Sequence, residues 1–185
     1  VKDMLAYLCV INNRADELRL QRIINNPPRG IGGKTLEMAE RQADAAGVPL
    51  YTVVSDPYSF PSLEKAAGKL MAFTVLIEEC AELLSTLSLP DFYEEVMTRT
   101  GYLRMLEEKG DVESRTRAEN VRELKSSIVS YVENTDAPTL AGFLEEIALY
   151  TDIEQYDPDA DAVVMMTMHA AKGLEFPNVF LVGFE

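Results

Sequence analysis

The residues best suited to chemistry lie in the last segment of the chain, from Thr167 to Glu185. Its polar turn holds the only histidine, His169, followed by a lysine, a glycine and then Glu175 between two apolar neighbours. Runs with strand character flank the turn, so these groups would lie at the carboxyl edge of a sheet, where open α/β folds bind ligands. Threonine and histidine donate hydrogen bonds to phosphate, and a carboxylate accepts them from sugar hydroxyls. The segment therefore predicts a phosphate site at Thr167 and His169 and a sugar contact at Glu175.

A plainer interpretation of these polar residues is also open. His169 would then cap the end of a strand, and Glu175 would be an ordinary surface residue. Isolated polar side chains are common near strand ends, so the spacing alone does not decide between a ligand site and a structural role.

A second group of candidate residues forms the stretch RIINNPPRGIGGKT, residues 22–35. A Gly-Ile-Gly turn between two helices exposes backbone amides, and an anion can sit at the N-terminus of the following helix. Positively charged side chains lie on both sides of the turn. Such an arrangement can bind the phosphate backbone of a duplex without contacting its bases. A glycine-rich helix connection without a ligand is the alternative, and the spacing is not that of a P-loop. The candidate duplex contacts are Arg29, Gly30, Ile31, Gly32, Lys34 and Thr35.

The charge distribution points to the same end of the chain. The net charge is −14, which argues against indiscriminate DNA coating, because Lys and Arg supply most non-specific affinity for phosphate. Residues 1–41 nevertheless carry seven Lys and Arg against five acids, so residues 42–185 carry ten against 26. If nucleic acid contacts this chain, the first 41 residues are the expected place.

The elements that must position these residues are mostly helices. Apolar periodicity, prolines and glycines place the boundaries, and Ser88 with Asp91 resembles a capping box. Two short apolar runs near the end read as strands buried on both faces, and such strands need sheet neighbours that the chain does not contain. The expected helices span 1–12, 18–24, 33–47, part of 49–61, 62–88, 88 to Gly101 or Gly110, 111–134 and 138–151, and the expected strands span 163–168 and 178–184.

Composition bounds the class of protein. The chain is 47% hydrophobic and 26% charged, which is typical of a soluble globular protein, and no apolar run approaches the ~20 residues that span a bilayer. We therefore expect no membrane segment. Cys9 and Cys80 are isolated thiols at apolar helical positions, which favours a reducing, cytoplasmic location over a zinc site. The chain begins without methionine and inside a helical pattern, which indicates a piece of a larger protein.

The string HAAKGLEFP, residues 169–177, resembles motif V of the superfamily 1 DNA helicases of the UvrD/PcrA/Rep type. The resemblance implies that Thr167 and His169 lie along single-stranded DNA and that Glu175 reaches the nucleotide ribose. The pattern RIIN-P-RGIG-T resembles the helix-hairpin-helix-like element that the same family places against duplex DNA in subdomain 2B. The implied fold class is mainly α, with residues 1–12 ending a first 2A segment, 13–157 forming helical subdomain 2B, and 158–185 returning to the RecA-like 2A domain through two strands.

The resemblance implies an activity for the longer protein: ATP-driven 3′-to-5′ translocation on single-stranded DNA with duplex unwinding. ATP and Mg would be its cofactors, and its partners would be single-stranded and duplex DNA and repair or replication proteins. The chain lacks the Walker A loop, the acidic Mg²⁺-binding motif, motif III and the motif VI arginine. Phosphoryl transfer needs a phosphate cradle, a metal and charge-stabilising groups together, so we predict that this polypeptide alone binds no cofactor and hydrolyses no ATP.

Two rival interpretations stay open. The acidic helical body could be a regulatory module that binds a protein partner, or the longer protein could be a helicase–nuclease of the same superfamily. The stretches 114–124 and 143–149 also resemble subdomain 2B, but we favour amphipathic helices with a solvated charged face. Arg115, Arg117 and Arg122 would then either meet DNA or neutralise nearby acids.

Overall fold

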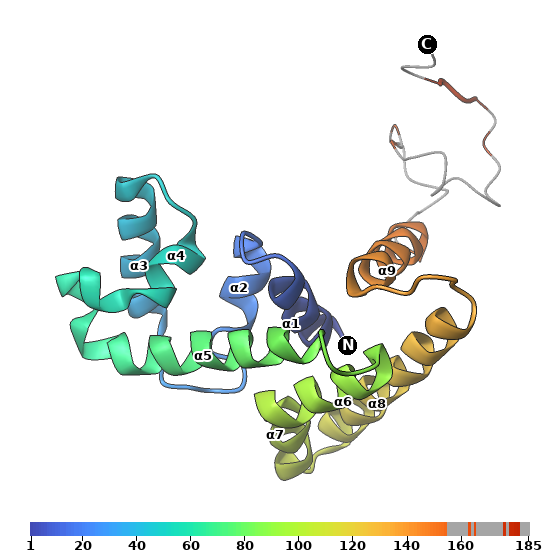
Figure 1. The fold of residues 1–185 in the computed structure, drawn as a ribbon, viewed down its shortest axis with the longest axis horizontal. Coiled ribbons are helices and arrows are strands. Elements are labelled where there is room, and N and C mark those ends of the chain that lie inside the picture. The colour runs from blue at the N-terminus through green and yellow to red at the C-terminus, as the bar shows by residue number, and fades with distance from the viewer. Residues whose placement is uncertain (155–162, 164, 166–175, 177, 182–185) are drawn as a thin grey trace.

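The computed structural model describes residues 1–154, 163, 165, 176 and 178–181. Within these residues the chain forms nine α-helices and two short 3₁₀ helices, so the mainly α prediction is confirmed (Figure 1). In chain order they are α1 (Lys2–Asn12), α2 (Glu17–Ile23), α3 (Gly33–Ala46), α4 (Leu50–Ser55), η1 (Pro57–Ser59), η2 (Pro61–Ala66), α5 (Ala67–Leu83), α6 (Leu89–Thr100), α7 (Tyr102–Lys109), α8 (Val112–Glu133) and α9 (Leu140–Glu154).

Local sequence signals set most helix boundaries. The side chain of Ser88 caps α6 by accepting a hydrogen bond from the backbone N–H of Asp91, and Asp111 caps α8 in the same way. Gly101 separates α6 from α7 because it adopts a left-handed conformation with φ of 70°, which an L-residue adopts only with strain. The expected helix over 62–88 is shorter than predicted: it opens as the 3₁₀ helix η2, and i→i−3 bonds tighten the chain after Leu83.

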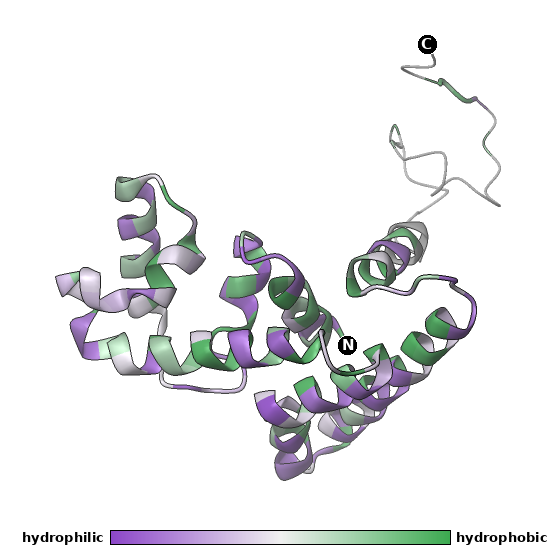
Figure 2. Ribbon diagram, viewed as in Figure 1, coloured by the Kyte–Doolittle hydropathy of each residue, from purple (hydrophilic) through white to green (hydrophobic). Residues whose placement is uncertain are grey.

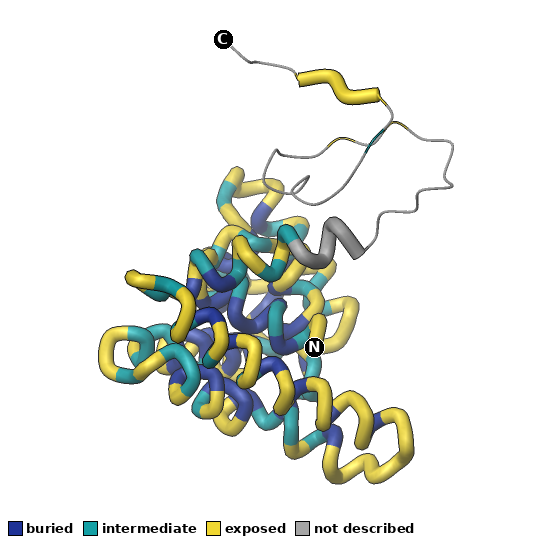
Figure 3. Tube along the Cα trace, turned by 90° about the vertical axis from the view of Figure 1, so that its right-hand side faces the viewer, coloured by how far each residue is buried: buried dark blue, intermediate teal, exposed yellow. Residues whose placement is uncertain are grey.

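One hydrophobic core runs through the helices. Helix α1 lies at its centre and contacts α2, α5 and α9, while α5 extends from α4 at one end to α6 at the other (Figure 1). Hydrophobic and hydrophilic residues alternate along the helices, and the buried residues gather where helices meet (Figures 2 and 3). Because residues of α1 share this core with the following helices, the structure does not separate 1–12 from 13–157. That predicted domain boundary stays a prediction.

The expected strands near the C-terminus are not seen among the described residues. Val163, Met165 and residues 178–181 are described and belong to no strand, and the rest of both runs lies outside the described part of the chain. Val163, Met165 and Phe180 are 93%, 91% and 89% exposed, although both runs were expected to be buried on two faces. A strand needs adjacent strands to pair its backbone and cover its side chains, and the described residues form no such strand.

None of the described helices is both long and apolar enough to cross a membrane.

A polar cluster joins the chain between α1 and α2 to α4 and α5. The guanidinium of Arg14 donates to both carboxylate oxygens of Glu78, from Nε at 3.0 Å and from Nη2 at 2.9 Å. The hydroxyl of Tyr51 donates to the same carboxylate at 2.6 Å, and the guanidinium stacks over its ring at 5.7 Å. Arg14 Nη1 also donates to the carbonyl oxygens of Val10 and Ile11 at the end of α1. The cluster therefore fixes the direction in which the chain leaves α1.

We expect Glu78→Gln to reduce the unfolding free energy by about 1 kcal/mol near neutral pH, because the Arg14 guanidinium then loses its bidentate partner. The hydrogen bond from Arg14 lowers the pKa of Glu78 below its ordinary value of 4.5. A carboxylate whose pKa is lowered by folding stabilises the fold at pH values above its ordinary pKa. This contribution of Glu78 is lost as the pH falls through the pKa of the folded state. Urea unfolding of both proteins at several pH values should therefore show a difference that shrinks on acidification.

The matched control is Glu82→Gln, which removes an exposed carboxylate from the same helix. No ion pair of Glu82 occurs among the described residues, so its stability should follow the parent chain at every pH. A pH-independent loss in Glu78→Gln would contradict the role given to the carboxylate.

Candidate nucleic-acid interface

The predicted duplex-binding residues lie around the connection between α2 and α3. We call residues 24–32 the glycine loop. The Asn25 side chain closes it, because its Oδ1 accepts hydrogen bonds from the backbone N–H of Arg29 at 2.8 Å and of Ile31 at 3.1 Å. Gly30 adopts a left-handed φ of 70°, and the Ile31 side chain is 1% exposed in the core. The loop is thus held in one shape from within and anchored by its isoleucine.

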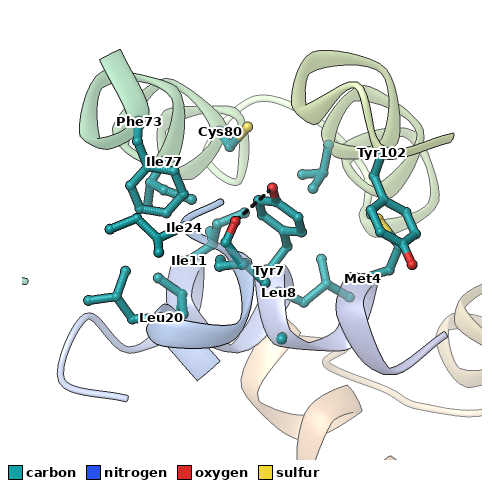
Figure 4. Close-up of a cluster of buried hydrophobic side chains, with 14 of the residues drawn as sticks. Met4, Tyr7, Leu8, Ile11, Leu20, Ile24, Phe73, Ile77, Cys80 and Tyr102 are labelled. Atoms are coloured by element: carbon teal, nitrogen blue, oxygen red, sulfur yellow. Dashed lines mark hydrogen bonds between the residues drawn. The ribbon is translucent and has the colours of Figure 1, made fainter. Parts of the chain in front are cut away.

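Arg29 turns inward from the glycine loop. Its Nη1 donates to the carbonyl oxygens of Ile23 and Pro27, both at 3.1 Å, and its Nη2 donates to the Tyr7 hydroxyl at 2.6 Å and to the carbonyl oxygen of Thr100 at 3.1 Å. The guanidinium also lies over the Tyr7 ring and over the ring of Phe73, at 5.7 and 5.5 Å. Figure 4 shows Tyr7 on α1 and Phe73 on α5 within the same buried cluster.

These contacts give Arg29 a structural role that the sequence did not predict. An arginine that binds phosphate must present free N–H groups to solvent. Both terminal nitrogens of Arg29 already donate to acceptors within the protein. All of these acceptors are neutral, and no carboxylate lies within 4.0 Å of the guanidinium in the described part of the chain. Arg29 therefore ties the glycine loop to α1, α5 and α6, and a direct contact between Arg29 and DNA stays a prediction.

The open groups of the interface belong to the start of α3. Gly32 is the N-cap and offers no side chain, so the backbone N–H groups of Gly33 and Lys34 have no acceptor among the described residues. The N–H groups of Thr35 and Leu36 instead bond to the carbonyl oxygen of Gly32, at 3.0 and 3.2 Å. Lys34 is exposed, and its ammonium forms no ion pair within the described residues. Exposed N–H groups, the positive end of the helix dipole and a lysine together suit an anion.

Two residues essential to this arrangement were not singled out from the sequence. Tyr7 reads as one more apolar position of a helix, and only the fold brings its hydroxyl to Arg29 and to the carbonyl oxygen of Asn26, at 2.8 Å. Burial raises the pKa of Tyr7 to about 12, so its hydroxyl keeps its proton for that bond. Asn25 carried a weak signal, because asparagine before a proline and glycine turn often bonds to nearby backbone.

The predicted motif V residues Thr167, His169 and Glu175 lie outside the described residues. The structure therefore adds no geometry to their predicted contacts with single-stranded DNA and nucleotide. Of the string that carries them, Phe176 is described and is partly buried.

The arginines of α8 mostly neutralise acids. Arg117 pairs with Glu113 on the same helix, and Arg122 pairs with Glu107 of α7. Arg115 is exposed and has no ion pair within the described residues. For Arg117 and Arg122 the prediction of a solvated charged face is confirmed.

A metal site is not indicated by the described residues. No group of three or more histidine, cysteine, aspartate or glutamate side chains there is arranged to hold a metal ion. Cys9 and Cys80 are both free, and burial raises the pKa of Cys80 to about 11, so its thiol stays protonated at neutral pH.

The structure shows a helical domain with a glycine-rich turn between α2 and α3, and α3 begins without a side-chain cap. The chain matches the family described as "UvrD-like helicase C-terminal domain" over residues 1–185, and it belongs to this family. The match to a UvrD/PcrA-type superfamily 1 helicase, predicted from the two motifs, is thereby confirmed.

Curated relatives give the same assignment. The chain is 36% identical over 191 residues to the "ATP-dependent DNA helicase PcrA" of Bacillus subtilis (strain 168), with 100% of this chain and 26% of the relative covered. It is also 36% identical over 187 residues to proteins of the same name in Staphylococcus aureus (strain Mu50) and Staphylococcus epidermidis, with the same coverage. The chain spans about a quarter of the length of these relatives.

Because Arg29 points inward whereas Lys34 is exposed, we expect their replacement to affect the stability of the fold differently. Arg29→Ala should lower the unfolding free energy by about 2 to 4 kcal/mol, because it leaves carbonyl acceptors of the loop unpaired and removes packing against two rings. Lys34→Ala should change it by less than about 0.5 kcal/mol, because the Lys34 side chain is exposed. Urea unfolding followed by circular dichroism measures both.

Arg115→Ala is the matched control, since it removes an exposed arginine that has no ion pair within the described residues. If Arg29→Ala is as mild as Arg115→Ala, the guanidinium does not hold the loop and the assignment fails.

Proposed function

We propose that this chain is part of an ATP-dependent DNA helicase, in which residues 13–157 contact or regulate duplex DNA and residues 158–185 couple single-stranded DNA to nucleotide. The observation that carries the proposal is the family match over all 185 residues, which includes both the glycine loop and the HAAKGLEFP string. In the full-length protein the activity would be 3′-to-5′ translocation driven by ATP with Mg. Repair or replication proteins would be its partners, and its two free thiols suit the reducing cytoplasm.

The proposed duplex contact uses the start of α3. Phosphate oxygens would accept hydrogen bonds from the backbone N–H groups of Gly33 and Lys34, and the Lys34 ammonium and the Thr35 hydroxyl would add to them. Gly30, Ile31 and Gly32 shape the turn so that the duplex backbone can approach. Asn25 and Arg29 already fix this shape in the free chain, which reduces the conformational entropy lost on binding. Such contacts carry no base information, so the grip would be independent of sequence.

The proposed role of residues 158–185 rests on the motif V string. Thr167 and His169 would hold the single-stranded track, and Glu175 would bind the ribose of ATP. The chain has no G-x-x-x-x-G-K-[ST] segment, so the phosphate cradle and metal ligands of ATP hydrolysis would come from elsewhere in the full-length protein. On this proposal the isolated chain hydrolyses no ATP.

Duplex binding by the chain tests the first role. We expect affinity for a short blunt duplex to fall steeply between about 50 and 200 mM salt, and Lys34→Ala to reduce the slope of log K against log salt by about 0.9. Fluorescence anisotropy with a labelled duplex measures both quantities. Absence of duplex binding, together with retention of a protein partner, would instead favour the regulatory module that the acidic body suggests.

The motif V role is tested in the full-length protein. His169→Ala should abolish most DNA-stimulated ATP hydrolysis while leaving the thermal unfolding curve unchanged, because the histidine would touch the DNA track rather than the core. A steady-state ATPase assay with and without single-stranded DNA provides the readout. Undiminished stimulation in this variant would count directly against the assignment.

A further inference from the structure

The pairing of positive side chains differs sharply between parts of the molecule. Eight Lys and Arg residues of the described part form ion pairs, namely Arg14, Arg19, Arg22, Arg99, Arg104, Arg117, Arg122 and Lys125. Eight others in the same part form none, namely Lys2, Arg29, Lys34, Arg41, Lys65, Lys69, Lys109 and Arg115. Five of these unpaired residues fall between 29 and 69, and that stretch contains no paired Lys or Arg at all.

The fold gathers this stretch into one region. Helix α3 contacts η2, and the side-chain amide of Gln42 on α3 donates to the Ser62 hydroxyl on η2 at 3.3 Å. The glycine loop lies beside the beginning of α5, where Lys69 donates a hydrogen bond to the carbonyl oxygen of Gly30 (Figure 1). Lys34 and Arg41 are seven residues apart on α3, so they share one face about 10 Å apart. The carboxylates of the same elements belong to Glu37, Glu40, Asp44 and Glu64, and none of them lies within 4.0 Å of a positive nitrogen of a described residue.

Lys69 brings a positive charge from a distant part of the sequence to the glycine loop. Its ammonium on α5 donates a hydrogen bond to the carbonyl oxygen of Gly30 at 3.1 Å, across 39 residues of sequence. This contact uses one of its three N–H donors and leaves the charge without a carboxylate partner among the described residues. A Cβ at position 30 would lie 2.7 Å from the Lys69 nitrogen, so the flexible end of the lysine would have to move to make room for it. Gly30 itself is required by its left-handed φ of 70°, which strains any L-residue.

We infer that Lys69 is a further phosphate contact of the duplex-binding surface, next to the start of α3. The ligand class is the phosphodiester backbone of duplex DNA. An exposed ammonium held beside the loop by a neutral carbonyl keeps two donors and a full charge for a phosphate, and binding would release counterions from the DNA. A carboxylate partner would have cancelled that charge, as carboxylates do for most arginines of α6, α7 and α8. This inference rests on the proposed duplex contact and adds a residue that lies outside the first 41.

The test measures duplex affinity of the chain against salt for four proteins: the parent chain, Lys69→Gln, Lys69→Arg and Lys109→Ala. Lys69→Gln can still donate to the Gly30 carbonyl but has no charge, so the slope of log K against log salt should fall by about 0.9. Lys69→Arg keeps the charge and should keep the slope. Lys109→Ala removes an equally exposed and unpaired lysine from α7, far from α3, and should leave the slope unchanged (Figure 1).

The outcomes separate this inference from the proposed function. If the parent chain binds no duplex, both fail together. If the parent chain binds and Lys34→Ala lowers the slope while Lys69→Gln behaves like Lys109→Ala, only the role of Lys69 is overturned. Urea unfolding of Lys69→Gln should match that of the parent chain, so a lowered slope reports a lost charge contact rather than a damaged loop.

Discussion

The fold and its candidate interface both depend on the half-buried guanidinium of Arg29. It joins the glycine loop to α1 through the Tyr7 hydroxyl, to the end of α6 through the carbonyl oxygen of Thr100, and to α5 through the ring of Phe73. Only a planar group with several donors can serve acceptors in so many directions while stacking on two aromatic rings. Because these acceptors are neutral, the charge is stabilised by hydrogen bonds and ring faces, and the loop shape depends on this side chain together with that of Asn25.

A fixed loop determines what can happen at its surface. The left-handed Gly30 and the extended Gly32 lead directly into α3, and the first amides of that helix receive no side-chain cap because Gly32 is the N-cap residue. Lys34 lies in the first turn of α3 and the Lys69 ammonium of α5 bonds to the carbonyl oxygen of Gly30, and neither has an acidic partner in the described chain. On the proposed function, a chain with a net charge of −14 would keep a local site for phosphate while the rest of its surface would repel nucleic acid. Strong local attraction with general repulsion would favour one binding orientation over many.

Sequence reasoning succeeded where the cause of a feature is local. Ser88, Gly101 and Asp111 mark helix ends by hydrogen bonds or backbone conformation within a few residues, so these signals predict the boundaries well. Arg29 is the opposite case, since its partners Tyr7 and Thr100 lie 22 and 71 residues away and no local pattern announces them. The same limit hid Lys69, and the two expected strands would need sheet neighbours, none of which occurs among the described residues. The helix expected over 18–24 rests on apolar periodicity, yet its first residue, Leu18, is 81% exposed, because a short helix packs only one face.

The most direct test of this account is an NMR titration of the isotope-labelled chain with a short blunt DNA duplex. We expect the backbone amide signals of Gly32, Gly33, Lys34 and Thr35 to shift in proportion to bound duplex, while the Arg29 guanidinium and the Tyr7 ring keep their free-state signals. That result would show an anion at the start of α3 on a loop held from within. Shifts that avoid these amides, or release of the Arg29 guanidinium from Tyr7 on binding, would contradict the central claim.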